Sequence, residues 1–169
     1  MLGFLMDDAL SGYDIKAKFE LSVSNFYNAS FGAIYPALRK MEQDGLVEKK
    51  VVPQEGKPNK NLYQITDSGR ETFLAYLNSP LEAALVRSDF LIRVFFARYA
   101  APEQFRGWME EERIRVQASL DTFREIKRRY PSMDPFEAKT LEFGIANAQM
   151  QIEWLDREID LLGKDGMEK

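Results

Sequence analysis

The chain contains no cysteine and no histidine among its 169 residues. It can therefore form no disulfide framework, no Ser-His-Asp or Cys-His triad and no zinc site of the usual kind. Carboxylate pairs, lysine chemistry and oxygen-ligated metals remain as routes to catalysis. The one dense acidic run, residues 110–112, lies on a predicted helix, where consecutive side chains point in three directions. We expect neither an enzyme nor a bound metal or other cofactor.

Long apolar runs are absent as well. No segment approaches the run of about 18 apolar residues that a membrane span requires, so we expect no membrane partner. The N-terminal stretch MLGFLMDDALSG lacks the basic flank of a signal peptide. Without cysteine, the cytoplasm is the default location. The 45% of residues that are hydrophobic and the 12% that are aromatic can form the core of one domain or two small ones.

The overall charge is weakly acidic, with a formal net charge of −4. One stretch differs, because residues 47–61 hold four lysines against two glutamates. A locally basic strip on a mildly acidic body can contact nucleic-acid phosphates. A solvated hairpin explains the same charges, and charge alone favours that reading.

The first half of the chain alternates between helical and extended patterns. The sequence Ser11-x-x-Asp14 has the form of a capping box and predicts a helix over about residues 12–20. A further helix begins near Ser30. It ends at Gly45, where a left-handed residue costs little.

This helix is the third in the chain, after a short first helix over residues 2–5, and it has two different faces. Ile34, Leu38 and Met41 recur at spacings of four and three, which assigns them to the core. The opposite face offers bare backbone, a tyrosine hydroxyl, a stiffening proline and two cations, which suit contact with phosphates and base edges. A solvated helix face would explain each of these residues singly. The candidate DNA-binding residues here are Ser30, Gly32, Tyr35, Pro36, Arg39 and Lys40.

Two short extended segments follow, separated by a turn cluster with two prolines and a glycine. They predict a β-hairpin with a basic tip. Thr66 or Ser68 then caps a fourth helix, and Ser68-x-x-Glu71 offers a second capping box. Three short helices, a two-stranded hairpin and a helix are the order of a winged helix-turn-helix. The candidate phosphate contacts on the hairpin are Lys49, Lys57 and Lys60.

The second half contains only helical signals. A helix is expected from Leu81 to Tyr99. Its run from Phe90 to Ala97 is apolar on nearly every side, so this helix should be buried on more than one face. Pro102 is well placed to begin another helix, over residues 102–130. The last helix carries a coiled-coil seam at strict four-three spacing. Its members are Leu141, Ile145, Ala148, Ile152, Leu155, Ile159 and Leu162.

The seam has two possible partners. The helix over residues 102–130 can cover it within one chain, or a second copy can cover it. We favour a homodimer built by this half. Aromatic residues near the link before Pro102 predict a slot for a small aromatic or lipophilic effector, although such clusters are more often core. The candidate ligand residues are Phe95, Phe96, Tyr99, Trp108 and Met109.

Several segments together resemble the PadR family of bacterial transcriptional regulators. Its members carry Gly-x-Ile-Tyr-Pro-x-Leu, then Leu or Met, Glu and Gly-Leu, and a wing that ends Tyr-x-Ile-Thr-x-x-Gly. The stretch SGYDIK is similar to the second helix of the family, so the match covers residues 1–77. The second half is similar only in pattern, with SDFLIRVFFARYAAPEQF resembling the Phe-rich dimerisation helix. The segments that carry the motifs are FGAIYPALRKMEQDGLV and EGKPNKNLYQITDSGRE.

The resemblance implies a mainly α (α+β) protein. Residues 1–78 would form a winged helix-turn-helix DNA-binding domain, and residues 79–169 a helical dimerisation and effector domain. The protein would be a homodimeric regulator, with repression favoured over activation, on an inverted repeat of double-stranded DNA. A small molecule or a second protein would tune its affinity. Tyr35, Pro36 and Arg39 fall on the recognition helix of the family, and Gly56, Lys57 and Lys60 on its wing tip.

Two departures from the family pattern stand out. The first helix, over residues 2–5, is shorter than usual, which suggests a truncated start. Asn61 stands where many relatives carry another basic residue, which predicts a weaker grip of the wing on phosphates. The alternative function is a winged-helix adaptor that binds protein and not DNA.

Overall fold

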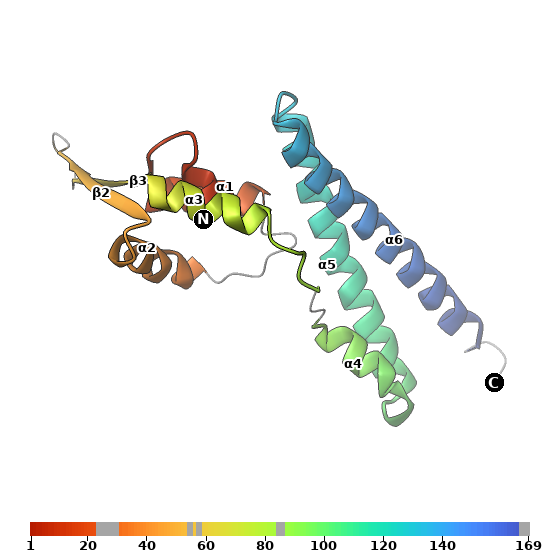
Figure 1. The fold of residues 1–169 in the computed structure, drawn as a ribbon. Coiled ribbons are helices and arrows are strands. Elements are labelled where there is room, and N and C mark those ends of the chain that lie inside the picture. Colours follow the sequence, from red (N-terminus) through yellow and green to blue (C-terminus); the bar gives the residue numbers. More distant parts are fainter. Residues whose placement is uncertain (23–30, 54–55, 57–58, 84–86, 166–169) are drawn as a thin grey trace. The chain divides into compact units, whose positions relative to one another are not determined.

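The computed structural model describes residues 1–22, 31–53, 56, 59–83 and 87–165. It divides into two compact units, Met1–Ala83 and Ala84–Lys169, each of which is described here by itself. The first unit combines short helices with a small sheet, and the second is entirely helical over the described residues (Figure 1). The predicted mainly helical α+β fold is therefore confirmed.

The first unit has the element order of a winged helix. The strands form one antiparallel sheet in the order β1-β3-β2. We call β2, β3 and the turn between them the wing. In chain order the elements are the 3₁₀ helix η1 (Leu2–Leu5), β1 (Leu10–Ser11), α1 (Gly12–Ser22), η2 (Phe31–Ala33), α2 (Ile34–Gln43), β2 (Val47–Val52), β3 (Lys60–Ile65) and α3 (Asp67–Leu77).

The predicted two-stranded hairpin forms, but the prediction was incomplete, because a third strand joins the sheet. Strand β1 has only two residues and pairs with β3 through Leu10–Tyr63 and Ser11–Leu62. A strand this short has no period of its own, so the sequence pattern missed it. Its pairing with β3 holds the start of α1 beside the wing.

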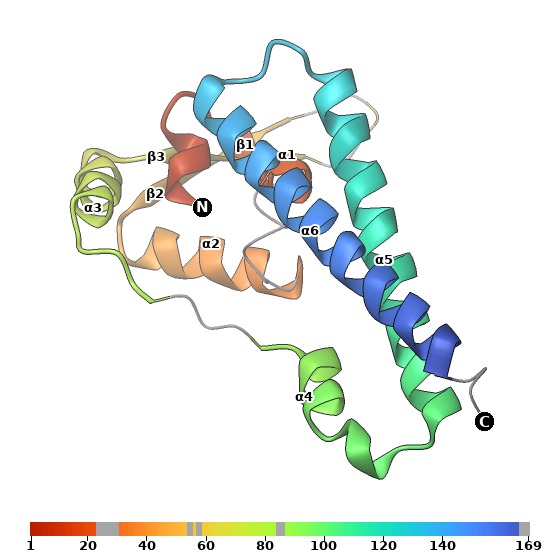
Figure 2. The ribbon, with the colours of Figure 1, turned by 90° about the vertical axis from the view of Figure 1, so that its right-hand side faces the viewer.

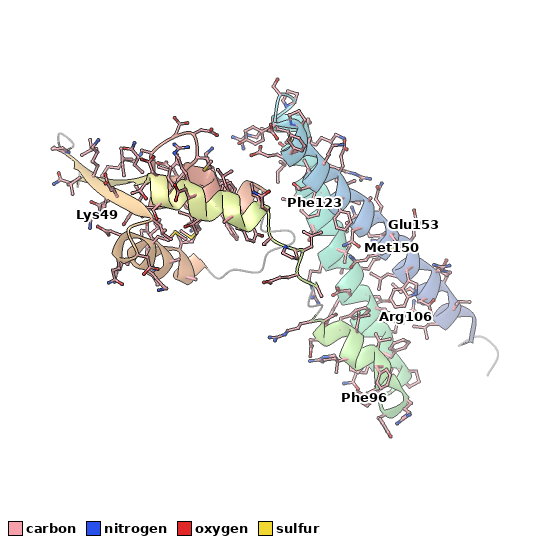
Figure 3. All side chains as sticks on the ribbon, in the orientation of Figure 1. Lys49, Phe96, Arg106, Phe123, Met150 and Glu153 are labelled. Atoms are coloured by element: carbon pink, nitrogen blue, oxygen red, sulfur yellow. The ribbon has the colours of Figure 1, made fainter. Side chains whose placement is uncertain are left out.

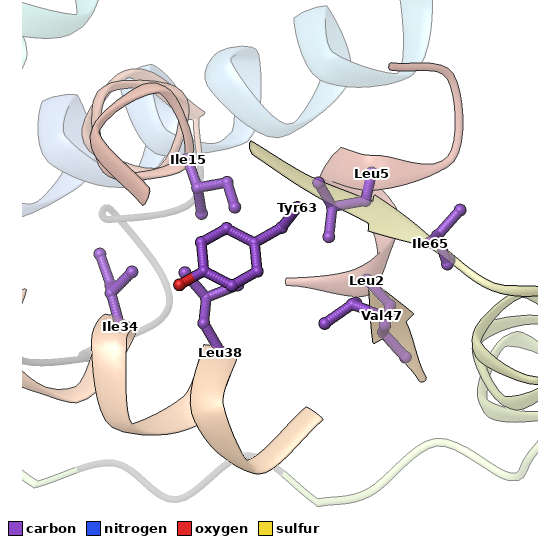
Figure 4. Close-up of a cluster of buried hydrophobic side chains, with 8 residues drawn as sticks. All are labelled: Leu2, Leu5, Ile15, Ile34, Leu38, Val47, Tyr63 and Ile65. Carbon is purple, nitrogen blue, oxygen red and sulfur yellow. The ribbon is translucent and has the colours of Figure 1, made fainter. Parts of the chain in front are cut away.

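The core of the first unit lies between α1, α2 and the sheet. Leu38 and Ile15 are completely buried, and the ring of Tyr63 lies among them (Figure 4). Ile34 is 4% exposed and Met41 packs at the edge, so the predicted inner face of α2 is confirmed. The buried cluster consists of Leu2, Leu5, Ile15, Ile34, Leu38, Val47, Tyr63 and Ile65.

Helix α2 ends as the sequence predicts. Gly45 has a φ of +71°, its N–H donates to the Glu42 carbonyl at 3.1 Å, and the Leu46 N–H donates to the Met41 carbonyl at 2.8 Å. This pair of bonds is a Schellman motif, in which glycine accepts the left-handed conformation without a β-carbon clash. The sharp stop turns the chain directly into β2.

Helix α3 is capped by Thr66, whose hydroxyl oxygen accepts the Gly69 N–H at 3.1 Å. The alternative cap at Ser68, with Glu71 as its reciprocal partner, is wrong, because Ser68 already lies inside the helix. The Thr66 hydroxyl also donates to the Gly45 carbonyl at 2.7 Å. This threonine therefore joins the start of α3 to the turn after α2.

The second unit is built on a hairpin of two long helices that lie side by side (Figures 1 and 2). Pro102 is the first residue of α5, as the sequence predicts. Arg113 of α5 pairs with Asp156 of α6, and Lys127 pairs with Glu142 at 3.1 Å. The elements are α4 (Asp89–Phe95), η3 (Ala97–Tyr99), α5 (Pro102–Arg129) and α6 (Pro135–Asp165).

The seam of α6 packs mainly against α5 of the same chain. Ala148, Ile152 and Leu155 are buried in the cluster that the two helices share. On α5, Val116 and Leu120 are buried, whereas Ser119 is exposed. The intrachain hairpin therefore covers most of the stripe.

The helix expected from Leu81 to Tyr99 is much shorter. Leu81 is completely exposed and lies outside any helix. Helix α4 begins only after Ser88, whose hydroxyl oxygen accepts the Leu91 N–H at 3.1 Å. A serine cap competes with continuation of a helix, which explains the late start.

Burial of this helix on several faces is also wrong for the single chain. Only Phe90 and Val94 pack against the α5–α6 core, with the Phe90 ring 6.3 Å from that of Trp154. The opposite side remains exposed over most of its length. Its exposed apolar residues are Leu91, Ile92, Phe95 and Phe96.

Among the described residues, no helix is both long and apolar enough to cross a membrane.

The packing of Gly69 gives a test of the first unit. A β-carbon on Gly69 would lie 2.1 Å from the Leu46 carbonyl oxygen and 2.8 Å from Ile65 Cγ1. Because the oxygen belongs to the backbone, Gly69→Ala must shift α3 or the turn after α2. We expect it to lower the free energy of unfolding by about 1–3 kcal/mol, measured by urea denaturation.

Gly107→Ala is the matched control. Gly107 also lies within a helix, and nothing stands within 4 Å of the β-carbon it would gain. We expect this change to be neutral or stabilising by up to about 1 kcal/mol. Equal losses for the two variants would contradict the close contact at Gly69.

Candidate nucleic-acid interface

The outer face of α2 is free within the first unit. Tyr35 is 50% exposed, and Pro36, Arg39 and Lys40 are exposed within the next five residues of the helix. Gly32, in η2 just before α2, is exposed as well. Pro36 lies in the first turn of α2, where backbone N–H groups need no intrahelical partner. The structure therefore brings these predicted residues together on one surface.

A groove of about 750 Å³ runs beside this surface. Its walls come from the first turn of α1, the outer face of α2 and both wing strands. Basic, acidic and aromatic side chains all line it, so its electrostatic character is mixed. The lining residues are Ser11, Gly12, Tyr13, Asp14, Tyr35, Arg39, Glu42, Gln43, Lys49, Asn59, Lys60, Asn61 and Tyr63.

Two wing lysines pair with carboxylates across the groove. Lys60 Nζ lies 3.0 Å from Asp14 Oδ2 of α1, and Lys49 Nζ lies 3.6 Å from Glu42 Oε1 of α2. All four side chains are between 36% and 40% exposed. Pairs at this exposure contribute about 0.2–1 kcal/mol, so a phosphate can replace the carboxylate as the partner of the lysine.

The cations of α2 differ in their partners. Lys40 Nζ lies 3.2 Å from Asp44 Oδ2, one turn along the helix. Arg39 has no carboxylate within ion-pair distance among the residues that the structure describes. The Arg39 guanidinium is thus available for a planar, two-bonded contact with an acceptor pair.

The pleat of β2 separates two neighbouring lysines. Lys49 shares the face of Val47, which is buried against α2, whereas Lys50 projects from the other face (Figure 3 labels Lys49). Lys49 alone of the two lines the groove. Ser30 and Lys57, also predicted to contact DNA, lie outside the described residues. Gly56 at the wing tip has a φ of +70°, a conformation that favours glycine.

Asp14 is fixed at the first turn of α1. The Ser11 hydroxyl donates to Asp14 Oδ2 at 2.7 Å, and the Ser11 N–H donates to the same oxygen at 3.1 Å. The Asp14 N–H donates in return to Ser11 Oγ at 3.2 Å, which confirms the predicted capping box. The Ser11 hydroxyl, together with Lys60, holds the pKa of Asp14 below its ordinary value of 3.8.

The candidate ligand residues are spread over two environments. Phe95 and Phe96 stack edge to face, with ring centroids 4.9 Å apart, beside a surface depression along α4. Met109 is 1% exposed inside the α5–α6 core. Tyr99 is 76% exposed, and the Trp108 ring carries the Arg93 guanidinium at 5.6 Å. The structure does not gather the five into one pocket, so the effector slot stays a prediction.

Comparison with known proteins decides the family. A model of the transcriptional regulator PadR-like family matches residues 1–75, and a model of the virulence activator alpha C-terminal family matches residues 86–163. The crystal structure of a PadR-like transcriptional regulator from Bacillus cereus is 37% identical, covers 97% of this chain and 96% of its own, and superposes with a TM-score of 0.89. The chain belongs to the PadR family.

Other PadR relatives agree over the same length. A probable transcriptional regulator of Mycobacterium tuberculosis is 30% identical over 94% of this chain and 93% of its own. The negative transcriptional regulator PadR of Bacillus subtilis is 24% identical over 98% and 96%. Structures of that B. subtilis protein, solved with operator DNA and with p-coumaric acid, share the fold at TM-scores of 0.83 and 0.76. PadR proteins are transcriptional regulators, which confirms that the chain is not an enzyme.

Sequence reasoning missed the acidic side of this PadR surface. Asp14 was identified only as a capping residue, and Glu42 was not singled out. Each meets its lysine only after α1, α2 and the wing have packed together, so no sequence spacing predicts either pair. The roles of the site residues remain predictions.

The Asp14 contacts predict a pH-dependent stability. Because the pKa of Asp14 is lowered on folding, its contribution is fully present above the unfolded value of 3.8 and is lost as the pH falls through the lower folded value. We expect the difference in melting temperature between the wild type and Asp14→Asn to be constant near neutral pH and to shrink below about pH 4.

Ser11→Ala supplies the internal check, because it removes the largest cause of the shift. The difference between Ser11→Ala and the double variant Ser11→Ala/Asp14→Asn should vary less with pH. Parallel melting curves for wild type and Asp14→Asn across the acid range would contradict the role of the capping box.

Proposed function

We propose that the chain binds double-stranded DNA as a homodimer, reads an inverted repeat and represses transcription. One observation supports this above all: the outer face of α2 is exposed beside a wing that carries lysines. In helix-turn-helix proteins the second helix of the motif lies in the major groove, and dimers place two such helices about 34 Å apart. On this proposal residues 1–78 are the DNA-binding domain and residues 79–169 the dimerisation and effector domain.

Within this proposal the side chains divide by task. Arg39 reads bases, because a guanidinium can donate two bonds to guanine O6 and N7. Tyr35, at the start of α2, contacts a phosphate or a base edge, and Lys40, in its last turn, supplies charge to a phosphate. The wing lysines contact the DNA backbone on either side of the major groove. To make these contacts, Lys60 separates from Asp14 and Lys49 separates from Glu42. Breaking those surface pairs costs little free energy compared with the free energy gained when each phosphate contact releases counterions.

The homodimer is supported by α4. Its exposed side carries Leu91, Ile92, Phe95 and Phe96, exposed between 50% and 78%, and their order along one short helix makes a continuous apolar strip. An exposed apolar strip on a protein without a membrane-spanning helix in its described part marks a protein contact. We assign the strip to the same strip of a second copy (Figure 3 labels Phe96).

Relatives support the remaining parts of the proposal. The B. subtilis protein is named a negative transcriptional regulator, which favours repression. Its structures with operator DNA and p-coumaric acid favour a DNA partner and a small aromatic or lipophilic effector. A thermal-shift titration with p-coumaric acid probes the effector directly. Binding to chromosomal DNA places the protein in the cytoplasm.

The DNA-binding role is tested with duplexes selected from a random library by the full chain. The selected duplexes should contain an inverted repeat. Arg39→Ala should weaken binding to the best duplex by about 1–3 kcal/mol and narrow the gap between the best duplex and its single-base variants. Gel-shift titration of each duplex measures both quantities.

The wing lysines supply the contrasting variant. Lys57→Ala/Lys60→Ala should weaken binding on every duplex alike and give a shallower dependence on salt concentration. An equal loss for Arg39→Ala on all duplexes would contradict base reading by α2. Absence of any salt-dependent duplex binding would instead favour the adaptor that binds protein.

The homodimer is tested by placing charge on α4. Phe95 is 78% exposed, so Phe95→Glu should leave the single chain folded while it disrupts the paired strips. We expect light scattering to fall from twice the chain mass to the chain mass, and DNA affinity to fall with it. Phe136→Glu is the control, because Phe136 is 75% exposed at the opposite end of the helical unit. A wild-type protein that stays monomeric at all concentrations would contradict the proposal.

A further inference from the structure

Gly12, the first residue of α1, lies directly beneath Tyr35 of α2. A β-carbon on Gly12 would stand 2.6 Å from Cε1, 3.1 Å from Cζ and 3.3 Å from the hydroxyl oxygen of Tyr35. All three atoms belong to the outer end of the phenol. The bare α-carbon of Gly12 therefore leaves the space into which the tyrosine ring fits.

The backbone gives no other reason for a glycine at this position. Among the described residues the glycines with positive φ are Gly45 and Gly56, and Gly12 is not one of them. Any residue could adopt its conformation, and glycine is the poorest helix former after proline. Gly12 is nevertheless buried. The missing side chain is explained by the contact with Tyr35.

The contact forms part of the wall of the groove. Gly12 and Tyr35 both line it, and 50% of the surface of Tyr35 remains exposed. Arg39 lies one turn further along the same face of α2. A change in the direction of the Tyr35 ring therefore changes the surface presented next to Arg39.

We propose that Gly12 is a positioning residue for DNA recognition, which acts by seating the ring of Tyr35 on the first turn of α1. This inference rests on the proposed DNA-binding function and adds a residue to it that does not itself contact DNA. A seated ring is already oriented when the duplex arrives. A ring that must be ordered on binding lowers the affinity, because fixing a mobile side chain has an entropic cost.

The substitution Gly12→Ala separates this role from folding. The atoms that its methyl group would meet are at the far end of a side chain that can rotate away, in contrast to the backbone oxygen above Gly69. We expect the melting temperature to change little. Affinity for the best selected duplex should fall by about three- to tenfold, because the displaced ring must be ordered again.

A double-mutant cycle tests whether Gly12 acts through Tyr35. The four proteins are the wild type, Gly12→Ala, Tyr35→Ala and the double variant, each titrated with the best selected duplex. If the ring is the route, Gly12→Ala should change affinity by less than about twofold in the Tyr35→Ala background. An equal effect in both backgrounds would overturn the inference and assign Gly12 to direct approach of a phosphate to the backbone.

A second measurement needs no DNA. One α-hydrogen of Gly12 occupies the direction of the absent β-carbon and so points at the Tyr35 ring. The ring current should separate the chemical shifts of the two Gly12 α-hydrogens in the NMR spectrum of the full chain. Tyr35→Ala should reduce that separation. If the chemical shifts of the Gly12 α-hydrogens are the same in Tyr35→Ala as in the wild type, the ring does not lie against Gly12 and the inference is overturned.

These results are distinguishable from failure of the proposed function. If the wild type selects no duplex, the DNA-binding proposal fails while the NMR result still reports on the contact. If the wild type binds and the cycle is additive, only the role of Gly12 fails. Gly107→Ala controls for the general effect of replacing a helical glycine, since no atom stands within 4 Å of its β-carbon.

Discussion

The surface that α2 presents depends on the packing of its opposite side. Ile34 and Leu38 are buried against Ile15, Val47 and Tyr63, and each such side chain contributes about 1.5–3 kcal/mol when it leaves water. Because a helix repeats every 3.6 residues, this burial fixes the rotation of α2 and turns its polar face outward. A register shift of one residue would expose apolar core side chains, so the same contacts that fold the unit also orient its candidate DNA-binding face.

The candidate interface is not a uniformly positive surface. Two of its wing lysines, Lys60 and Lys49, already have carboxylate partners, Asp14 and Glu42, on the two helices they face. Asp14 cannot follow Lys60, because Ser11 holds its carboxylate in the capping box. The lysine side chain is long and half-exposed and can turn away. A phosphate can therefore bind Lys60, but the negative charge of Asp14 remains nearby and repels it. This repulsion limits the affinity for any duplex that is held without base contacts.

Periodicity and capping rules predicted the parts of the fold that depend on neighbours in the chain. The inner face of α2, the Gly45 stop and the Ser11–Asp14 box belong to this class. Contacts between distant segments were missed: β1 exists only by pairing with β3, and the Gly12–Tyr35 contact joins residues in two helices. The length of α4 was wrong because apolar composition suggested a continuous helix, whereas the Ser88 cap sets its start.

On the proposed function, the exposed strip on α4 strengthens DNA binding by the first unit, because it pairs two copies of the chain. A single first unit offers few groups to a duplex, and its wing residues Lys49 and Lys60 must first exchange carboxylates for phosphates. A dimer makes the second half-site an intramolecular event at high effective concentration, so two weak contacts combine into a tight one. Apolar pairing through Ile92 and Phe95, which touches no DNA, would then decide whether a mixed-charge surface binds tightly enough to regulate. The exposed apolar side chains of α4 have no role in a monomer, whereas a regulator that binds as a dimer requires such a surface for pairing.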